Sequence, residues 1–406
     1  MGEDVGREVE LEPQRIAHGG ISVARLDGRV VFVADAIPGE RVAARITDDR
    51  KKAFWRADAV RVLEASPHRR PHVWAEAAIE RDPDDRAGGA EFGHIENAHQ
   101  RELKAEVLRD ALQRFGGIER TVEVEALPGP ADGTRWRTRV RLHVDADGTV
   151  GPYAARSHRV IPVSSLPLAV EAVEALAPRD GMDGVDTVDV LAPSEGEARL
   201  IVGRQAPSTI RERVGDREFR LDDGGFWQVH TAAPATLSAA VQDVVDRELL
   251  DPRAANLDLY GGVGLLAAAL GDLAGPSLRI TSVESDERAT EHAAENLSEW
   301  IGARAETARV ERWVRGLADA SAAENDRLAA ATVILDPPRS GAGRDVLAAL
   351  AAVRPAQLVY VACDPVAFAR DAGVLAGLGY ELGPLRAFDL FPNTHHVEAV
   401  GRFARV

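Results

Sequence analysis

The segment Ala331–Asp371 restricts the possible folds of this chain more than any other. It contains two short apolar runs, Thr332–Leu335 and Leu358–Val361, with the composition of buried parallel strands. Between them, Arg344–Val353 has the length and periodicity of a helix. A strand, a crossover helix and a second parallel strand form a βαβ unit, so the segment predicts an open α/β sheet.

Each of these two strands ends in a polar turn. Asp336-Pro337-Pro338-Arg339 follows the first strand, and Cys363-Asp364-Pro365 follows the second. In open α/β sheets, ligands bind in the crevice at the carboxyl ends of the strands. A carboxylate, an arginine and the single cysteine of the chain are therefore expected at one site.

A glycine-rich turn earlier in the chain has the character of a nucleotide-binding loop. The predicted strand Asn256–Tyr260 runs into Gly262–Ala267, which has the pattern G-x-G-x-x-A. Glycines at these positions let the backbone turn tightly and approach a ligand at the helix N-terminus. The next predicted strand, Arg279–Val283, ends in Glu284, whose carboxylate can accept both hydroxyls of a ribose.

Two observations separate the cofactors that use such a loop. Folds that bind NAD and folds that bind S-adenosylmethionine share it, but no acid–base constellation of a dehydrogenase follows here. Asp258 lies inside the strand, where it can orient the loop or meet a positively charged ligand. Asp336-Pro337-Pro338 is a turn that many methyltransferases place beside the methyl sulfonium. The sequence therefore favours S-adenosylmethionine.

The composition excludes several kinds of protein. One cysteine rules out an internal disulfide framework and any metal or iron–sulfur site that needs several thiolates of this chain. No apolar run approaches the roughly 20 residues of a membrane span, and the charged first residues contain no signal-peptide core. We therefore expect a cytoplasmic protein without a membrane partner. The net charge of −16 argues mildly against nucleic acid as a partner, but local patches decide that question.

Residues 1–64 are predicted to form a small β-barrel, in which Asp27-Gly28 is a strong hairpin signal. Basic and aromatic residues share the loop after Thr47, a combination that suits contact with a nucleic-acid backbone and stacking on bases. Aromatic side chains that fold back onto the barrel explain the same pattern equally well. The predicted strands are Arg7–Leu11, Ile21–Arg25, Arg29–Val33, Arg41–Thr47 and Ala57–Leu63, and the loop residues are Arg50, Lys51, Lys52, Phe54, Trp55 and Arg56.

Residues 65–225 are predicted to form a central β-rich domain. It begins with irregular linking structure and a helix, Ala98–Phe115, that we expect to pack on the catalytic part of the chain. Four arginines then alternate with other residues, so a strand would present all four on one face. Binding to phosphate is favoured for this row, although acidic neighbours could neutralise it. The four residues are Arg135, Arg137, Arg139 and Arg141.

Residues 226–406 are predicted to form a Rossmann-like domain. Its last two strands, Leu382–Leu390 and Val397–Arg405, are joined by the short connection Phe391–His396. A connection of this length requires an antiparallel pair, so one strand of an otherwise parallel sheet is expected to be reversed.

Five motifs stand out along the chain: FWQVH at 226–230, LDLYGGVG at 257–264, LDPPRSG at 335–341, YVACDP at 360–365 and FPNTHHVE at 391–398. In order and spacing they resemble those of the RNA uracil-5-methyltransferases, which make 5-methyluridine in transfer or ribosomal RNA. The resemblance covers nearly the whole chain. It implies an α/β fold: a class I methyltransferase domain with a mostly parallel seven-stranded sheet, an N-terminal OB-like barrel of the TRAM type that binds RNA, and a central β-rich RNA-binding domain.

The resemblance also implies the site. Cys363 corresponds to the nucleophile of the family, and Glu398 corresponds to the base that removes the proton from uracil C5. The residues that correspond to contacts with S-adenosylmethionine are Gln228, Asp258, Tyr260, Gly262, Glu284 and Asp336.

The chemistry of the family explains these residue types. Uracil C5 is a poor nucleophile, but a thiolate that adds to C6 converts the ring to an enolate whose C5 attacks a methyl group. A base must then remove the C5 proton before the thiol leaves. Cysteine suits this role because its thiolate is accessible near neutral pH, and Arg339 is expected to favour the thiolate. Phe226 or Trp227 is expected to stack on a base taken out of its RNA stack.

At several positions this chain differs from the family pattern, and these differences change what we expect there. Many members bind a four-iron cluster through cysteines before the first long helix, whereas residues 88–94 contain none, so we expect no iron–sulfur cluster. Arg309 stands where an acidic residue usually contacts the adenine. Gly261 stands where cysteine is usual, and His230 and Asp364 stand where asparagine is common.

The sequence thus predicts a monomeric, S-adenosylmethionine-dependent RNA uridine C5-methyltransferase acting on tRNA or rRNA. A lone cysteine can instead be a small buried hydrophobic residue, and Glu398 can instead be the partner of a structural ion pair. An amino methyltransferase would leave both residues idle. The third possibility is an inactive RNA-binding module with a vestigial cofactor fold.

Overall fold

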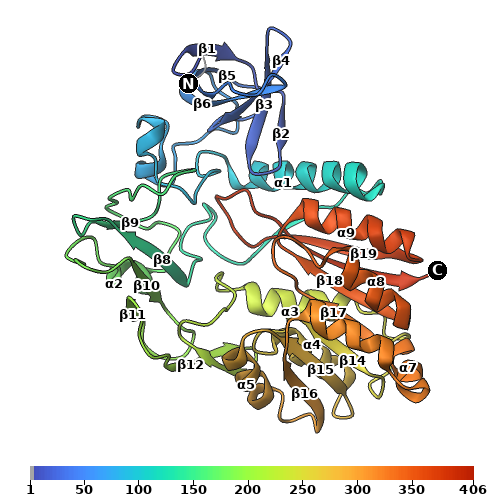
Figure 1. Cartoon of the computed structure of the whole chain (residues 1–406). Helices are drawn as coiled ribbons and strands as arrows, with labels where there is room; N and C mark the ends of the chain where they lie inside the picture. The colour runs from blue at the N-terminus through green and yellow to red at the C-terminus, as the bar shows by residue number, and fades with distance from the viewer. Residues whose placement is uncertain (1–3) are drawn as a thin grey trace.

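The computed structural model describes residues 4–406. Residues 1–3, the start of the predicted N-terminal domain, lie outside the described residues. Figure 1 shows the N-terminal sheet at the top, the central sheet at the left, and the large α/β sheet at the right and the bottom.

The N-terminal part forms a six-stranded sheet with the order β1-β5-β6-β4-β3-β2. The predicted hairpin at Asp27-Gly28 is confirmed: β3 and β4 pair antiparallel, and both turn residues have the positive φ (49° and 83°) that a tight hairpin turn requires. The strands are β1 (Glu8–Leu11), β2 (Arg15–Ala17), β3 (Ile21–Leu26), β4 (Arg29–Ala34), β5 (Arg41–Asp48) and β6 (Phe54–Glu64).

Two interpretations were open for the basic loop between β5 and β6: contact with nucleic acid, or aromatic side chains that fold back onto the sheet. The structure agrees in part with each. Trp55 is buried in the sheet, with the Arg29 guanidinium 4.1 Å above its ring. Lys51 lies 4.8 Å above the ring of Phe54, and Arg50 pairs with the neighbouring Asp48. The two aromatics therefore fold back, while the basic side chains stay at the surface.

A long helix, α1 (Asn97–Ala111), follows two short 3₁₀ turns, Ala75–Ala77 and Pro83–Asp85. It continues into a wider turn, Leu112–Gly116, and ends at Gly117, whose φ of 65° suits glycine. Its buried apolar face packs against α9 of the α/β part, in one core cluster. The predicted helix is confirmed.

The central part contains a four-stranded antiparallel sheet with the order β11-β10-β8-β9 and a separate two-stranded hairpin. The sheet has its own apolar core, built around Trp136. Its strands are β8 (Arg139–Val144), β9 (Val150–Gly151), β10 (Thr187–Leu191) and β11 (Arg199–Val202); the short helix α2 is Glu171–Leu176, and the hairpin is β12 (Thr209–Val214) with β13 (Arg217–Asp222).

The largest sheet has the order β16-β15-β14-β17-β18-β20-β19-β7. Strand β20 is antiparallel to both neighbours while the other pairings are parallel, which confirms the mostly parallel sheet with one reversed strand. Strand β7 extends the edge beyond the seven predicted strands. The strands are β7 (Val124–Ala126), β14 (Asn256–Leu259), β15 (Arg279–Glu284), β16 (Gly302–Thr307), β17 (Thr332–Leu335), β18 (Gln357–Ala362), β19 (Tyr380–Asp389) and β20 (Glu398–Arg405).

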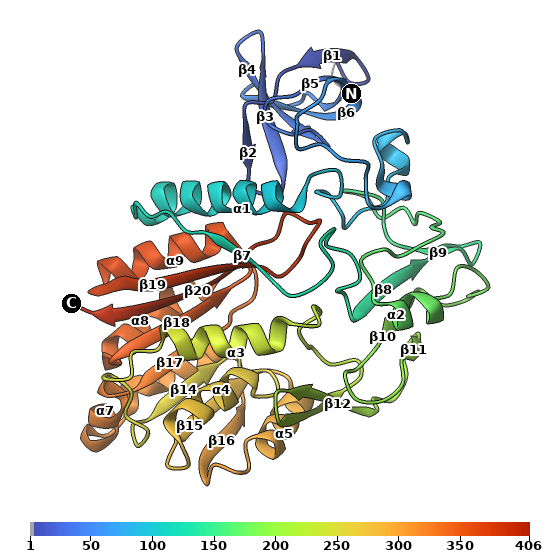
Figure 2. The ribbon, with the colours of Figure 1, turned by 180° about the vertical axis from the view of Figure 1, so that it is seen from behind.

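Helices cover both faces of this sheet (Figures 1 and 2). Helices α3 and α4 pack on one face and α8 and α9 on the other, each pair within its own apolar cluster. Across residues 4–406, no helix has both the length and the apolar character to cross a membrane. The helices are α3 (Ala233–Val244), α4 (Leu265–Ala274), α5 (Glu287–Asn296), α6 (Val310–Trp313), α7 (Ala322–Ala329), α8 (Gly343–Val353) and α9 (Pro365–Gly377).

Candidate active site

A cavity of about 1020 Å³ opens at the carboxyl ends of β14, β15, β17 and β18. This is the crevice in which open α/β sheets bind ligands. All eight residues predicted for the site line it, together with the expected accessory residues Phe226, Trp227 and Arg339. The eight are Gln228, Asp258, Tyr260, Gly262, Glu284, Asp336, Cys363 and Glu398.

The glycine-rich loop adopts a conformation that explains its composition. Gly262 and Gly264 have φ of 53° and 90°, and a side chain at Gly262 would point into open space within the cavity wall. Glu284, at the end of β15, accepts a hydrogen bond of 3.2 Å from the Gly262 backbone N–H. The carboxylate expected to bind a ribose therefore also holds the loop.

Asp258 is a buried carboxylate with unused hydrogen-bonding capacity. Its Oδ2 accepts from the Ser282 hydroxyl at 3.3 Å, whereas its buried Oδ1 has no partner within the described chain. Burial raises its pKa to about 7, and raises the pKa of nearby Asp336 to about 7 together with the charge of Asp258. An unsatisfied buried carboxylate in a cavity wall is suited to a positively charged ligand group.

This burial predicts a pH-dependent stability effect for Asp258→Asn. The pKa of this carboxyl group rises from 3.8 to about 7 on folding. It therefore does not lower the free energy of unfolding below about pH 3.8, and it lowers it most, by up to about 4 kcal/mol, above about pH 7. The variant should therefore gain free energy of unfolding relative to wild type as the pH rises through this window, measured by urea unfolding of the ligand-free protein. Asp326→Asn, at an exposed position of α7, is the control. A constant difference across the window would contradict the prediction.

The register of the sheet places Cys363 opposite Glu398. Ala362, the last residue of β18, pairs with Ala399 of the antiparallel β20. Cys363 follows that pair on one strand and Glu398 precedes it on the other. Cys363 is half-buried at the cavity wall, so it is not a purely structural core residue. Glu398 is buried, and no Lys, Arg or His within residues 4–406 forms an ion pair with it.

The electrostatics of this pair correct one expectation. Burial, together with the carboxylates of Glu398 and Asp336, raises the pKa of the Cys363 thiol to about 12. Arg339 lowers that pKa, as expected, but these larger effects outweigh it. The thiol is therefore protonated near neutral pH in the ligand-free protein. The sequence could not reveal this, because the burial of the thiol depends on the fold. Burial and Asp336 likewise raise the pKa of Glu398 well above its usual range.

The segment before α3 forms a further wall of the cavity. Phe226 is an exposed aromatic at the cavity rim, with 73% of its surface accessible. Trp227 is buried 5.6 Å from the ring of Phe219, so its predicted stacking on a base is not supported. His230 is buried against Trp136, and burial lowers its pKa to about 4.

The predicted row of four arginines is not one strand. Arg135 has a φ of 58°, and β8 begins only at Arg139. The backbone near Arg137 instead bridges to Ala169 and His230. Three of the four side chains pair with carboxylates, the alternative that the sequence left open, namely Arg135 with Glu174, Arg139 with Glu212 and Arg141 with Asp189. Arg137 lines the cavity instead.

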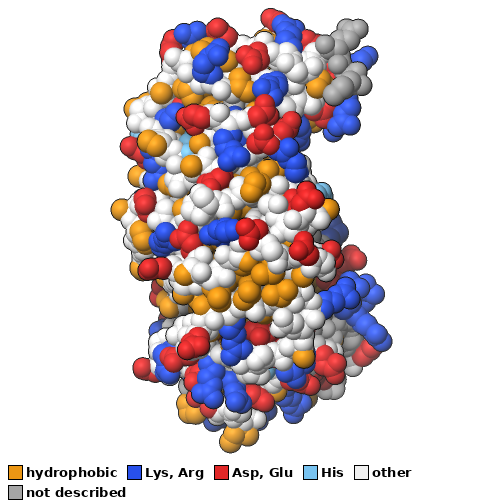
Figure 3. All heavy atoms as spheres, turned by 90° about the vertical axis from the view of Figure 1, so that its left-hand side faces the viewer, with side chains coloured by type: hydrophobic (Ala, Val, Ile, Leu, Met, Phe, Trp, Pro, Cys, Tyr) orange, Lys and Arg blue, Asp and Glu red, His pale blue; other side chains and the backbone are white. Residues whose placement is uncertain are grey.

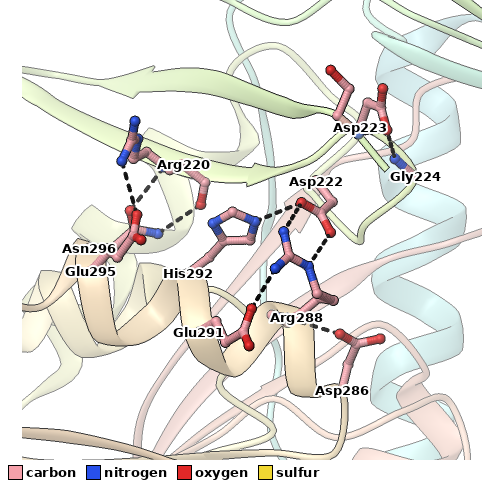
Figure 4. A network of polar contacts seen from close by, with 12 residues as sticks. Arg220, Asp222, Asp223, Gly224, Asp286, Arg288, Glu291, His292, Glu295 and Asn296 are labelled. Carbon is pink, nitrogen blue, oxygen red and sulfur yellow. Dashed lines mark hydrogen bonds and ion pairs between the residues drawn. The ribbon is translucent and has the colours of Figure 1, made fainter. Parts of the chain in front are cut away.

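The sequence did not point to a polar network that closes the cavity beside the glycine loop (Figure 4). Asp222, at the end of β13, accepts hydrogen bonds from Arg288 at 3.0 Å and shares a 2.8 Å contact with His292. Both basic residues belong to α5, and all three line the cavity. Arg309 also lines it, and its exposed side chain lies 3.7 Å from Glu311, a second lining residue.

Two family models match the chain. "TRAM domain" matches residues 3–60, and "tRNA (Uracil-5-)-methyltransferase" matches residues 213–404. An uncharacterized RNA methyltransferase of Streptomyces avermitilis is 37% identical, covering 98% of both chains. The 23S rRNA (uracil(1939)-C(5))-methyltransferase RlmD of Pseudomonas putida is 30% identical, covering 98% of this chain and 94% of its own. This chain belongs to the RNA uracil-5-methyltransferase family.

A solved structure agrees on the fold. The tRNA (uracil-54, C5)-methyltransferase of Pyrococcus abyssi, in complex with S-adenosyl-L-homocysteine, superimposes with a TM-score of 0.67 at 22% identity, covering 97% of this chain and 99% of that one. The family models and these relatives make the chain an RNA methyltransferase with an N-terminal TRAM domain. Within residues 4–406, no group of three or more His, Cys, Asp or Glu side chains is placed to hold a metal ion.

Proposed function

We propose that this methyltransferase modifies C5 of a uridine in rRNA or tRNA, with Cys363 as nucleophile and Glu398 as base. The observation that carries the proposal is the register of β18 and β20, which sets the two side chains opposite one another at the cavity of the cofactor loop. Neither side chain has a structural partner that would account for it: Cys363 is half-buried, and Glu398 is a buried carboxyl without an ion-pair partner within residues 4–406.

The lining residues fit S-adenosylmethionine. Glu284 lies where it can accept ribose hydroxyls, the unsatisfied Oδ1 of Asp258 suits the positively charged end of the cofactor, and Gly262 leaves room for close approach. The remaining contacts are assigned to Gln228, Tyr260 and Asp336. Bound S-adenosylmethionine supplies an electrophilic methyl group to the reaction.

Covalent catalysis by Cys363 accounts for the activation of uracil. The thiol loses its proton to water, and its sulfur forms a bond to C6 while the electrons of the C5–C6 double bond pass to O4. With S-adenosylmethionine bound, the enolate carbon C5 would take the methyl group as its bond to the sulfonium sulfur breaks, leaving S-adenosylhomocysteine. The Arg339 guanidinium lowers the pKa of the thiol and so favours this first step.

Glu398 completes the reaction as a general base. Its carboxylate takes the C5 proton, the enolate re-forms, and the C6–S bond breaks to return the Cys363 thiolate. Because burial and Asp336 raise its pKa, the ionised group is a stronger base than an ordinary glutamate. Phe226, exposed at the rim, is assigned to stacking on the extruded base.

RNA binding is assigned to the TRAM domain and to the central part, with the protein acting as a cytoplasmic monomer. Acidic and basic side chains are interspersed on the face shown in Figure 3, which suits contact through local groups instead of one uniformly basic surface. The basic loop around Lys51 and Lys52 is one such group.

Nucleoside mapping tests this function. Ribosomal and transfer RNA from cells with and without the gene would be digested and sequenced by mass spectrometry, with the Cys363→Ala gene as a second comparison. We expect one 5-methyluridine site to disappear in both deficient strains. A missing methyl group on an exocyclic amine would instead show an amino methyltransferase, and an unchanged profile with intact RNA binding would show an inactive binding module.

A further inference from the structure

An apolar cluster joins the N-terminal domain to the linking segment and to helix α1, which packs in turn on α9 of the methyltransferase domain. Ile16 and Ile37 of the N-terminal part pack with Phe92 and Ile95 of the linking segment and Leu103 of α1. Each of these five residues is at most 3% exposed. In Figure 1 and Figure 2, β2 points from the N-terminal sheet down onto α1.

The turn after β2 reaches the residue next to the nucleophile. Nε2 of His18 lies 3.3 Å from Oδ2 of Asp364. Asp364 directly follows Cys363, and its other carboxylate oxygen caps α9 by accepting from the backbone N–H groups of Val366 and Ala367 at 3.0 and 2.8 Å. A side chain of the N-terminal domain thus contacts the segment that carries Cys363.

The same turn contacts the loop that carries Glu398. A Cβ atom on Gly20 would lie 2.6 Å from Cβ of His395 and 3.0 Å from the Phe92 ring, so the Gly20 backbone packs directly on this loop. His395 is three residues before Glu398, and its Nδ1 lies 3.5 Å from Glu91. The turn therefore sits against both catalytic segments at once.

The rest of that loop is held by Asn393, which is fully buried and has a φ of 66°. Its backbone N–H donates to Gln100 at 2.8 Å, and its backbone carbonyl accepts from Phe92 at 2.9 Å. Its side chain accepts from Arg70 and Gln100 and donates to the carbonyls of Asp132 and Gly133. The Gly20 turn therefore packs on a loop whose start is fixed and which leads directly to Glu398.

We propose that His18 and Gly20 of the TRAM domain are positioning residues of the active site, which hold the Cys363 and Glu398 segments in register with each other. The N-terminal domain then contributes to the rate of methyl transfer as well as to RNA binding. The inference rests on the proposed roles of Cys363 and Glu398.

Two neighbouring glycines provide a matched test. Gly19 and Gly20 both have positive φ, 84° and 71°, so alanine strains the backbone at either position. A Cβ on Gly19 meets nothing within 4 Å, whereas a Cβ on Gly20 meets His395. Gly20→Ala should lower the single-turnover rate at saturating RNA and S-adenosylmethionine by at least about tenfold, with dissociation constants for both ligands within about twofold of wild type. Gly19→Ala should retain the wild-type rate.

His18→Ala provides an independent arm that adds no backbone strain, and it decides the question if Gly20→Ala does not fold. We expect a slower single-turnover rate with unchanged ligand affinities, and no further loss when Asp364→Asn is added. Equal rates for the two glycine variants, or a loss confined to RNA affinity, would overturn the proposal and show a simple tether. If the wild-type product is not 5-methyluridine, the proposed function fails, but the contrast between Gly19 and Gly20 can still be measured on the product that forms.

Discussion

Cys363→Ala is expected to lower 5-methyluridine formation by at least about 10⁴-fold, because without the C6 adduct the ring of uracil is never activated. The measurement is transfer of a labelled methyl group to RNA, followed by nucleoside analysis. The cavity offers no substitute nucleophile of the same kind, since Cys363 is the single cysteine of the chain.

The loss should be confined to chemistry. Cys363 lies on the β18 side of the cavity, apart from the β14–β15 side that holds Asp258 and Glu284, so calorimetric binding of S-adenosylmethionine should be unchanged. Glu284→Ala serves as the comparison variant. In contrast to Cys363→Ala, it should weaken binding of the cofactor and disturb the loop at Gly262. An active Cys363→Ala enzyme whose product carries a methyl group on an amine would replace the proposed chemistry with that of an amino methyltransferase.

The α/β sheet could be predicted because its central strands are buried on both faces. Thr332–Leu335 and Leu358–Val361 are continuous apolar runs, and burial on both faces is what makes such runs recognisable. Strands β2 and β7 are three residues long and carry no such pattern. They exist because neighbouring strands offer backbone partners, which the local sequence does not reveal.

The site could be predicted because the ends of parallel strands converge. Each of Asp336, Glu284 and Cys363 directly follows or ends a strand, so sheet topology alone brings them together. Their protonation states could not be predicted in the same way. The high pKa of the Cys363 thiol arises from burial and from Glu398, which is 35 residues away in sequence but opposite in the sheet.

The row of four arginines also shows that contacts between distant segments could not be predicted from the sequence. The arginines do alternate with other residues in the sequence. The left-handed backbone of Arg135 and the carboxylates that pair with the row, however, depend on distant segments. The contact of Gly20 with His395 joins residues even farther apart in the chain. Contacts between domains leave no periodic trace, so only the folded chain reveals them.

Glu398→Gln is expected to lower turnover by about 10²–10⁴-fold while leaving methylated RNA covalently attached to the protein. Glutamine matches the shape of glutamate but has no carboxylate that can accept a proton. Attack by Cys363 and methyl transfer therefore proceed, but no group removes the C5 proton and the C6–S bond cannot break. The adduct should survive denaturing electrophoresis and carry the labelled methyl group.

Two comparisons make this outcome specific to the base. The double variant Cys363→Ala, Glu398→Gln should form no adduct, because the bond to RNA is made by the Cys363 sulfur. Glu398→Asp keeps a carboxylate on a shorter side chain, so it should turn over slowly without accumulating the adduct to the same extent. Near wild-type turnover by Glu398→Gln would exclude an essential base. Inactivity without adduct under single-turnover conditions would move Glu398 to an earlier step, in which it orients the uracil ring before Cys363 attacks.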